Sequence, residues 1–304
     1  RAIFMQRWMS SGRRINGSGR IQCLSRDTQM KKYDAIIIGA GHNGLTNATY
    51  LAKAGLNTLV IEKNDYIGGA AVTRELHEGW FYSNCSYVCS MMRQSIHRDL
   101  NLTKHGLILV PYLGTVTFGD SGDTISAYHS EGPYYNELRA RSPHDADAMF
   151  RLQADLNRYA QLIRKTLMRT PPDPTSFKPR DVKELIFLAK EFGALGEQEI
   201  YEYIRFFTMS AAEFLDDYFE DDLIKAAMAS PGIIGTALGV YSPGSAYILL
   251  HHVMGDVDGS IGAWGLARGG MGAISHAIAG ALQEHGGEIR TNSPVQKIIV
   301  KNKK

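Results

Sequence analysis

Hydrophobic and polar positions alternate between two clear patterns, beginning with a short apolar run at 35–38 in which β-branched residues dominate. A run without polar alternation is typical of a strand covered on both faces in a parallel sheet. Residues 45–53 then carry apolar side chains at helical spacing and stop at Gly55, a residue type that commonly follows a helix end. A second apolar run, 58–61, ends on Glu62. The pattern predicts a β-α-β unit.

Helical periodicity dominates the middle of the chain, from 142 to 219. Ser142 and Asp145 form a helix start signal, and an apolar stripe runs from Met149 to Leu167. Further helix starts are predicted near Asp181, near Glu197 and at Ser210–Glu213. The segment from 81 to 135, before these helices, is mixed, with strand-like runs at 107–110 and 116–118.

The last third of the chain carries three further patterns. Residues 226–255 contain no charged side chain except histidine, but glycines and prolines interrupt them. This pattern predicts buried interior and not a membrane span, with a monotopic contact to lipid as the alternative. An apolar face at 274–282 predicts a helix that Gly286 ends. The runs 288–291 and 295–300 are expected to form paired strands.

Composition narrows the class of protein. The chain has 304 residues, 44% of them apolar and 21% charged, as in ordinary globular proteins. The net charge of +2 disfavours nucleic acid as a partner, because that partner requires a clustered basic surface. Three cysteines are too few for a disulfide scaffold or an all-thiolate zinc site, so we expect a reducing compartment and no metal.

The first 30 residues have a composition of their own. Six arginines and several serines precede the first acidic residue, Asp27, which is typical of an organelle transit peptide. We therefore expect import into the mitochondrial matrix, with peripheral contact to the inner membrane left open. A basic tail without a targeting role is the alternative.

The glycines after the first predicted strand indicate a dinucleotide site. Gly39 allows a sharp turn, Gly41 lets the backbone approach a pyrophosphate, and Gly44 allows the helix to pack closely on the strand. The following helix N-terminus favours phosphate. Glu62 is placed to accept hydrogen bonds from ribose hydroxyls, which disfavours NADP. A glycine turn that is only structural is the alternative.

A second glycine pair, Gly68-Gly69, follows soon after Glu62 and suits a ligand longer than the first turn can hold. The motifs at 39–44 and 67–73, together with Ser86-Tyr87, resemble the phytoene desaturase-like branch of the FAD-dependent amine oxidase superfamily. This resemblance favours FAD over NAD.

The resemblance implies an α/β fold in which a Rossmann-type FAD-binding domain carries an inserted, mainly helical substrate domain. The expected divisions are a leader (1–30), a first FAD-binding part (31–80), the substrate domain (81–260) and a second FAD-binding part (261–304). It also implies that Val295 meets the adenine through its backbone. The expected cofactor-binding residues are Gly39, Ala40, Gly41, Asn43, Gly44, Glu62, Lys63, Gly68, Gly69, Ala70 and Val295.

The family closes its flavin site with a C-terminal glycine segment that this sequence does not reach, so we expect an N-terminal fragment that holds FAD weakly. The implied function is oxidation of an unknown, small apolar substrate in support of mitochondrial function. An NAD-linked dehydrogenase is one alternative, and a non-catalytic, flavin-stabilised protein that binds mitochondrial partners is another.

No catalytic side chain is assigned from the sequence, because the flavin ring itself carries the redox step in such enzymes. Adjacent residues His251 and His252 point to different sides of an element, so at most one could face a cavity. Cys85 and Cys89 are expected to be buried structural thiols, not a dithiol pair.

Overall fold

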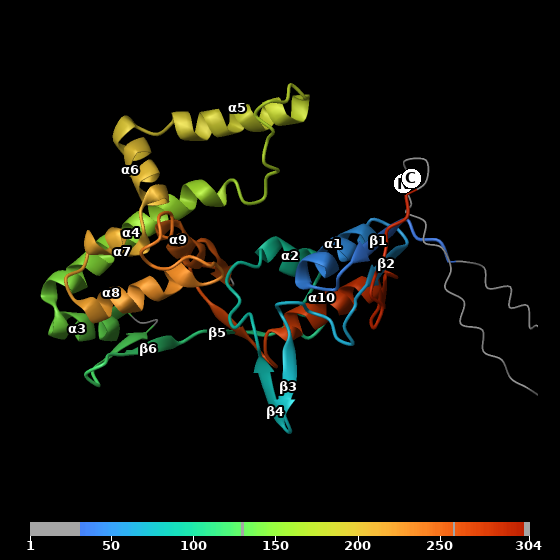
Figure 1. The fold of residues 1–304 in the computed structure, drawn as a ribbon, viewed down its shortest axis with the longest axis horizontal. Coiled ribbons are helices and arrows are strands. Elements are labelled where there is room, and N and C mark those ends of the chain that lie inside the picture. The colour runs from blue at the N-terminus through green and yellow to red at the C-terminus, as the bar shows by residue number, and fades with distance from the viewer. Residues whose placement is uncertain (1–30, 129–130, 258, 301–304) are drawn as a thin grey trace, which may run out of the picture. The chain divides into compact units, whose positions relative to one another are not determined.

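The computed structural model describes residues 31–128, 131–257 and 259–300. The predicted leader, 1–30, lies outside them. The chain divides into two compact units (Figure 1). Unit 1 comprises Arg1–Val88, Ser95–Ile108 and Ala267–Lys304, and unit 2 comprises Cys89–Gln94 and Leu109–Leu266.

A three-stranded parallel sheet is the centre of unit 1. Its strands lie in the order β1 (Ala35–Ile38), β2 (Thr58–Ile61) and β11 (Glu288–Arg290). Ala35 pairs with Thr58 and Ile289 with Val60, so β2 is hydrogen-bonded on both edges and is buried throughout. Helix α1 (His42–Lys53) connects β1 to β2. The predicted β-α-β unit is confirmed.

Helix α10 (Gly272–Glu284) packs against α1 in unit 1, where the Thr49 hydroxyl lies 3.4 Å from the Ile278 carbonyl oxygen. Its buried face includes Ile274, Ile278 and Leu282, as the periodicity predicts. The helix ends before Gly286, whose φ of +80° reverses the chain.

The prediction of a strand at 295–300 is wrong, because these residues have no regular structure. The chain turns out of β11 at Asn292, where φ is +49°. The next backbone N–H groups donate to residues beside the end of β2: Asn292 to the Asn64 carbonyl and Ser293 to the Glu62 carbonyl, both at 2.8 Å. No described strand lies beside residues 295–300, so their backbone groups have no partner strand with which to form a sheet.

Unit 1 also contains a two-stranded antiparallel ribbon, β3 (Thr73–His77) and β4 (Trp80–Ser83). Several of its aromatic side chains are exposed. The short helix α2 (Gln94–Asp99) begins at the last residue of a unit 2 segment and continues in unit 1.

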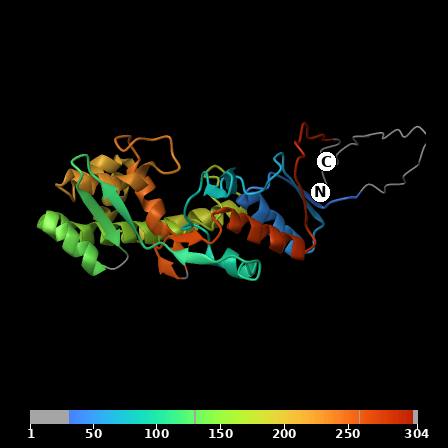
Figure 2. The same cartoon turned by 90° about the horizontal axis from the view of Figure 1, so that it is seen from below.

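Unit 2 is mainly helical (Figure 2). Its helices are α3 (Glu131–Arg141), α4 (Pro143–Arg164), α5 (Pro179–Gly193), α6 (Glu197–Thr208), α7 (Ala211–Asp216), α8 (Asp222–Ala229) and α9 (Ala246–Met254), with a 3-10 turn, η1 (Ser230–Ile233), between the last two. Three strand pairs accompany them: β5 (Leu109–Pro111) with β10 (Gly265–Ala267), β6 (Gly114–Phe118) with β7 (Thr124–Tyr128), and β8 (Asp256–Val257) with β9 (Ser260–Ile261). The last residue of β10, Ala267, is the first of the final segment of unit 1.

The core of unit 2 is rich in aromatic side chains. Tyr159 stacks on Phe206 with ring centroids 4.5 Å apart, and Phe214 meets Phe206 edge-on at 4.8 Å. The predicted helix start at Ser142 is confirmed, since its hydroxyl accepts the Asp145 N–H at 3.1 Å.

Buried interior was predicted for all of 226–255, and this is correct only for its second part. Helix α9 is largely buried, but the loop before it is not: Tyr241 is 83% exposed. Glycine and proline break the loop into turns that cannot form one apolar face. None of the described helices has the length and apolarity that a membrane crossing requires.

Candidate nucleotide-binding site

The first glycine turn leads from β1 into α1 in unit 1. Gly39 has φ of +100°, and its N–H donates to the Ile61 carbonyl at 2.7 Å, which fixes the turn to the end of β2. A Cβ at Gly44 would lie 2.2 Å from the Gly39 carbonyl oxygen, so only glycine fits there. The sharp turn and the close helix packing that the spacing predicts are both present.

Glu62 follows β2 directly and is only 7% exposed. One carboxylate oxygen, Oε2, accepts the Ala40 N–H at 2.7 Å, and Oε1 accepts the Asn64 N–H at 3.0 Å. Burial would raise the pKa of this carboxyl, but backbone N–H groups from Asn64, Ala40 and Lys63, with the Lys63 charge, hold the pKa below its usual value. The group is therefore an ionised acceptor at neutral pH.

The second glycine pair lies beside the first turn. Gly68 donates its N–H to the Ala40 carbonyl at 2.8 Å and forms a parallel bridge with Gly41. A Cβ at Gly69 would lie 3.1 Å from the Gly41 Cα. Two bare backbone segments and the Glu62 carboxylate thus meet in one corner of unit 1.

Several other predicted cofactor-binding residues are less buried than Glu62. Asn43, in the first turn of α1, is exposed, as are Lys63 and Ala70. Val295 is half-buried in the irregular segment that follows β11, in which the Ser293 N–H donates to the Glu62 carbonyl.

The N-terminus of α1 is open to an anion. Its cap residue, Gly41, offers no side-chain acceptor, and the first turn holds no acidic residue. In contrast, Asp221 caps α8 by accepting two N–H groups, from Leu223 and Ile224. The first N–H groups of α1 therefore remain available for a phosphate, and the positive end of the helix dipole favours one. These residues fit the adenosine and pyrophosphate parts of a dinucleotide.

Two hydroxyl groups to which the sequence assigned no role bind the glycine-rich segment at 269–272 of unit 1. Thr73 accepts the Gly272 N–H, and Ser83 accepts the Met271 N–H, both at 2.9 Å. A Cβ at Gly270 would lie 2.3 Å from the Thr73 hydroxyl. The start of α10 is thereby fixed to the ribbon that directly follows the Gly68-Gly69 segment.

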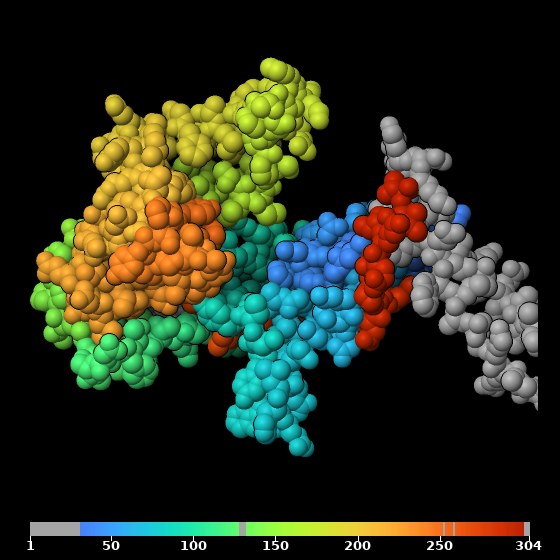
Figure 3. Space-filling model, in the orientation of Figure 1, coloured from blue at the N-terminus to red at the C-terminus, as the bar shows by residue number. Residues whose placement is uncertain are grey.

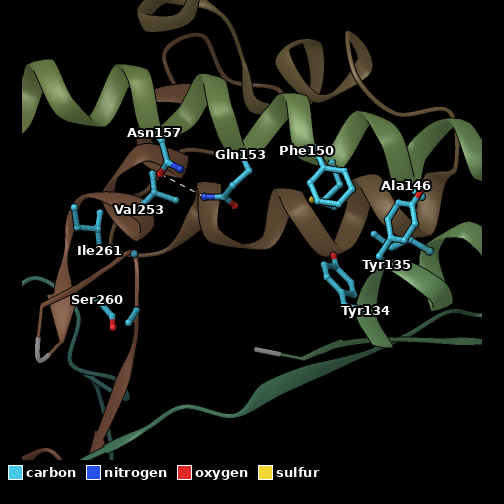
Figure 4. A pocket seen from close by; sticks show the side chains of 13 residues that line it. Tyr134, Tyr135, Ala146, Phe150, Gln153, Asn157, Val253, Ser260 and Ile261 are labelled. Carbon is cyan, nitrogen blue, oxygen red and sulfur yellow. Dashed lines mark hydrogen bonds between the residues drawn. The ribbon is translucent and has the colours of Figure 1, made fainter. Parts of the chain in front are cut away.

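Unit 2 contains a cavity of about 490 Å³ bounded by α3, α4, α9 and the β8–β9 ribbon (Figure 4). Tyr134 and Phe150 lie at one end, and Gln153 donates to the Asn157 side chain at 3.4 Å towards the other. No charged side chain is among the lining residues. The sequence did not predict this cavity, although Phe150, Gln153 and Asn157 recur at helical spacing along α4.

The side chains considered for other chemistry are placed as follows. Cys85 is exposed, which contradicts its expected burial; it lies in an irregular segment that offers no packed face. Cys89 is buried, and burial raises its pKa to about 11. His251 packs edge-on against the Tyr247 ring at 5.0 Å, and burial lowers its pKa. The His252 side chain lies outside the described part of the chain.

His144, Asp145 and Glu220 are close enough together to share a metal ion. However, the Asp145 carboxylate already accepts N–H groups from Glu220 and Asp221. Its role here is to connect the start of α4 to the start of α8.

Comparison with known proteins decides the family. The profile of the flavin containing amine oxidoreductases matches residues 44–304. The chain belongs to this family. Membership confirms FAD as the cofactor and an α/β FAD-binding fold.

Relatives support the same assignment. The chain is 36% identical over 296 residues to pyridine nucleotide-disulfide oxidoreductase domain-containing protein 2 of Rattus norvegicus, covering 92% of this chain and 51% of the relative. It is 25% identical to human all-trans-retinol 13,14-reductase, covering 92% and 44%. A putrescine oxidase structure shares the fold, with a TM-score of 0.50, 20% identity and coverage of 86% and 51%. The chain thus spans about half the length of the curated relatives it matches.

Proposed function

We propose that the whole protein is an FAD-dependent oxidoreductase that removes hydride from a neutral, largely apolar substrate. The observation that carries the proposal is the meeting of two bare glycine segments, an open helix N-terminus and an ionised Glu62 in unit 1. When bound, the isoalloxazine ring of FAD supplies the redox chemistry as the hydride acceptor.

The proposed roles of the residues follow from their chemistry. Glu62 accepts hydrogen bonds from the ribose hydroxyls, since each oxygen has acceptor capacity beyond the N–H it already binds. The N–H groups at the start of α1, which include that of Asn43, hold the pyrophosphate. Gly41 and Gly69 keep side chains out of its path. Lys63, Ala70 and the Val295 backbone complete the adenosine contacts.

The cavity in unit 2 supports a neutral substrate. Its lining offers apolar and aromatic surface with two amides, and it holds no carboxylate that would pair with an ammonium group. Two relatives with similarity along most of the chain are named for retinol and prolycopene, which are apolar polyenes. We therefore favour a neutral apolar molecule over a charged amine.

The place of action we propose is the mitochondrial matrix, where the protein would support mitochondrial function. The Arg- and Ser-rich, acid-poor composition of 1–30 is the support for this part of the proposal. Fluorescence microscopy of the tagged whole protein, with and without these residues, tests it; equal mitochondrial signal from both would contradict the role of the leader.

Anaerobic reduction of the bound flavin tests the proposed activity. The purified whole protein should be yellow, and a fractionated neutral lipid extract of mitochondria should bleach its flavin absorbance. A yellow protein that no fraction bleaches would instead support the non-catalytic, partner-binding alternative. A folded but colourless protein would contradict both.

A further inference from the structure

Helix α5 in unit 2 directs its acidic side chains towards basic residues of the same unit. Glu191 pairs with Lys165 at 2.6 Å, and Glu184 pairs with Arg169 at 2.7 Å, both cations lying at or just beyond the end of α4. The third acid, Asp181, is buried. The negative charges of the helix are therefore neutralised or withdrawn from its outer surface.

The opposite side of α5 is apolar and exposed. Val182, Ile186 and Ala189 recur at the spacing of one helix face, and all three are exposed, with Ile186 at 65%. Phe177, two residues before the helix, is 95% exposed. Figure 3 shows this helix at the edge of unit 2, in yellow-green. This exposed apolar side is unusual for a helix that is otherwise anchored by ion pairs.

Basic side chains flank the apolar side. Lys183 and Lys190 lie on the same border of it, one residue after Val182 and after Ala189, and Lys178 precedes the helix. All three are exposed and have no ion-pair partner among the described residues. Between 165 and 193 the chain has six basic and four acidic residues. The unpaired charged side chains described at this surface are therefore positive.

We propose that α5 docks on the surface of an anionic lipid bilayer, with Val182, Ile186 and Phe177 at the acyl boundary and Lys183 and Lys190 among the headgroups. An apolar helix face bordered by lysines is the pattern of helices that lie in the membrane interface. The negative potential of anionic lipids attracts such lysines, which gives the face charge complementarity with that partner. The inference is independent of the flavin site, because no residue of unit 1 takes part.

Vesicle flotation with the whole protein tests the docking. Phosphatidylcholine vesicles containing 30% phosphatidylglycerol should carry the protein upward, whereas pure phosphatidylcholine vesicles should carry much less. The double variant Lys183→Glu/Lys190→Glu should lower partitioning about tenfold or more, because each lysine near the surface adds to binding. Its matched control is Arg98→Glu/Lys297→Glu, which changes charge equally at exposed sites elsewhere and should bind as the wild type does.

A second pair of variants, both at exposed positions, tests the apolar side. After subtraction of the emission of the three native tryptophans, Ile186→Trp should show emission that shifts to the blue on anionic vesicles and is quenched by brominated lipid acyl chains. Leu113→Trp, at another exposed apolar position of unit 2, should show neither effect. The proposal is overturned if the wild type stays unbound with anionic vesicles, if both charge-reversed pairs lose binding equally, or if the Ile186→Trp emission does not respond; the face would then be assigned to a protein contact.

Discussion

Two glycines of the first turn differ in what a methyl group would meet. At Gly44 an added Cβ would lie 2.2 Å from the Gly39 carbonyl, whereas at Gly41 its nearest neighbour would be the Gly69 Cα at 3.8 Å. We predict that Gly44→Ala destabilises the protein by about 1–3 kcal/mol or more. Gly41→Ala should unfold near the wild-type temperature yet lose FAD, because its methyl group occupies the pyrophosphate path. Thermal unfolding and flavin titration measure the two effects; equal losses of stability would contradict this division.

The two described cysteines should differ in reactivity, because the thiolate is the reactive form. Burial raises the Cys89 pKa to about 11, while Cys85 is exposed. In a Cys23→Ser chain at pH 8, a colorimetric disulfide reagent should modify one thiol rapidly and the second only after denaturation. Adding Cys85→Ser should remove the rapid phase. Rapid modification of both thiols in the folded protein would contradict the burial of Cys89.

Residue-level prediction from sequence succeeds where a spacing has one geometric meaning. The interval from Gly39 to Glu62 implies strand, turn, helix and strand, and the structure places both residues as that order requires. It failed for Cys85, because burial was expected from the residue type alone, whereas Cys85 lies in an irregular, exposed segment. Thr73 belongs to the 67–73 motif, but its role in binding Gly272 had no local signal, since the two residues lie 199 positions apart.

At the level of elements, Asp145 joins two helices of unit 2. Its buried carboxylate accepts N–H groups from Glu220 and Asp221, just before α8, while Asp145 itself lies in the first turn of α4. Burial would raise the pKa of the carboxyl, but the hydrogen bonds from His144 and those two N–H groups hold the pKa below its usual value. Folding therefore favours the ionised form.

A pH series tests this link. Because the folded pKa lies below the unfolded one, the stabilisation is complete above the unfolded value, ~4, and is lost as pH falls through the folded value. Asp145→Asn should lower the free energy of unfolding at pH 7 by about 1–3 kcal/mol. In this variant the free energy of unfolding should also fall less steeply below pH 5 than in the wild type. The control Asp222→Asn, whose side chain is 97% exposed, should leave both nearly unchanged. Identical pH profiles for Asp145→Asn and wild type would refute the link.

The helix starts could be predicted because the residues that cap a helix lie close together in the sequence. Ser142 and the Ser210–Glu213 capping box bind N–H groups within three residues, so the sequence holds the whole signal. The strand expected at 295–300 depends instead on a partner strand, and the buried interior expected for 226–255 depends on what covers it. Neither condition can be read from a local pattern.

At the scale of the molecule, family motifs predicted the fold class and the cofactor, and both are confirmed. The cavity in unit 2 was not predicted, because it forms where α3, α4 and α9 meet the β8–β9 ribbon. Its Tyr134 and Val253 are more than a hundred residues apart in sequence. Only the folded unit brings such residues to one surface.

The flavin content of the purified whole protein after charge reversal at Glu62 tests the central claim most directly. Glu62→Lys removes the acceptor for the ribose hydroxyls and places a cation among donors, so the protein should lose most of its FAD. Glu78→Lys, an exposed position on the β3–β4 turn, makes the same charge change and should retain flavin. Circular dichroism must show both variants folded. If Glu62→Lys binds as much FAD as wild type, this corner of unit 1 does not hold the adenosine.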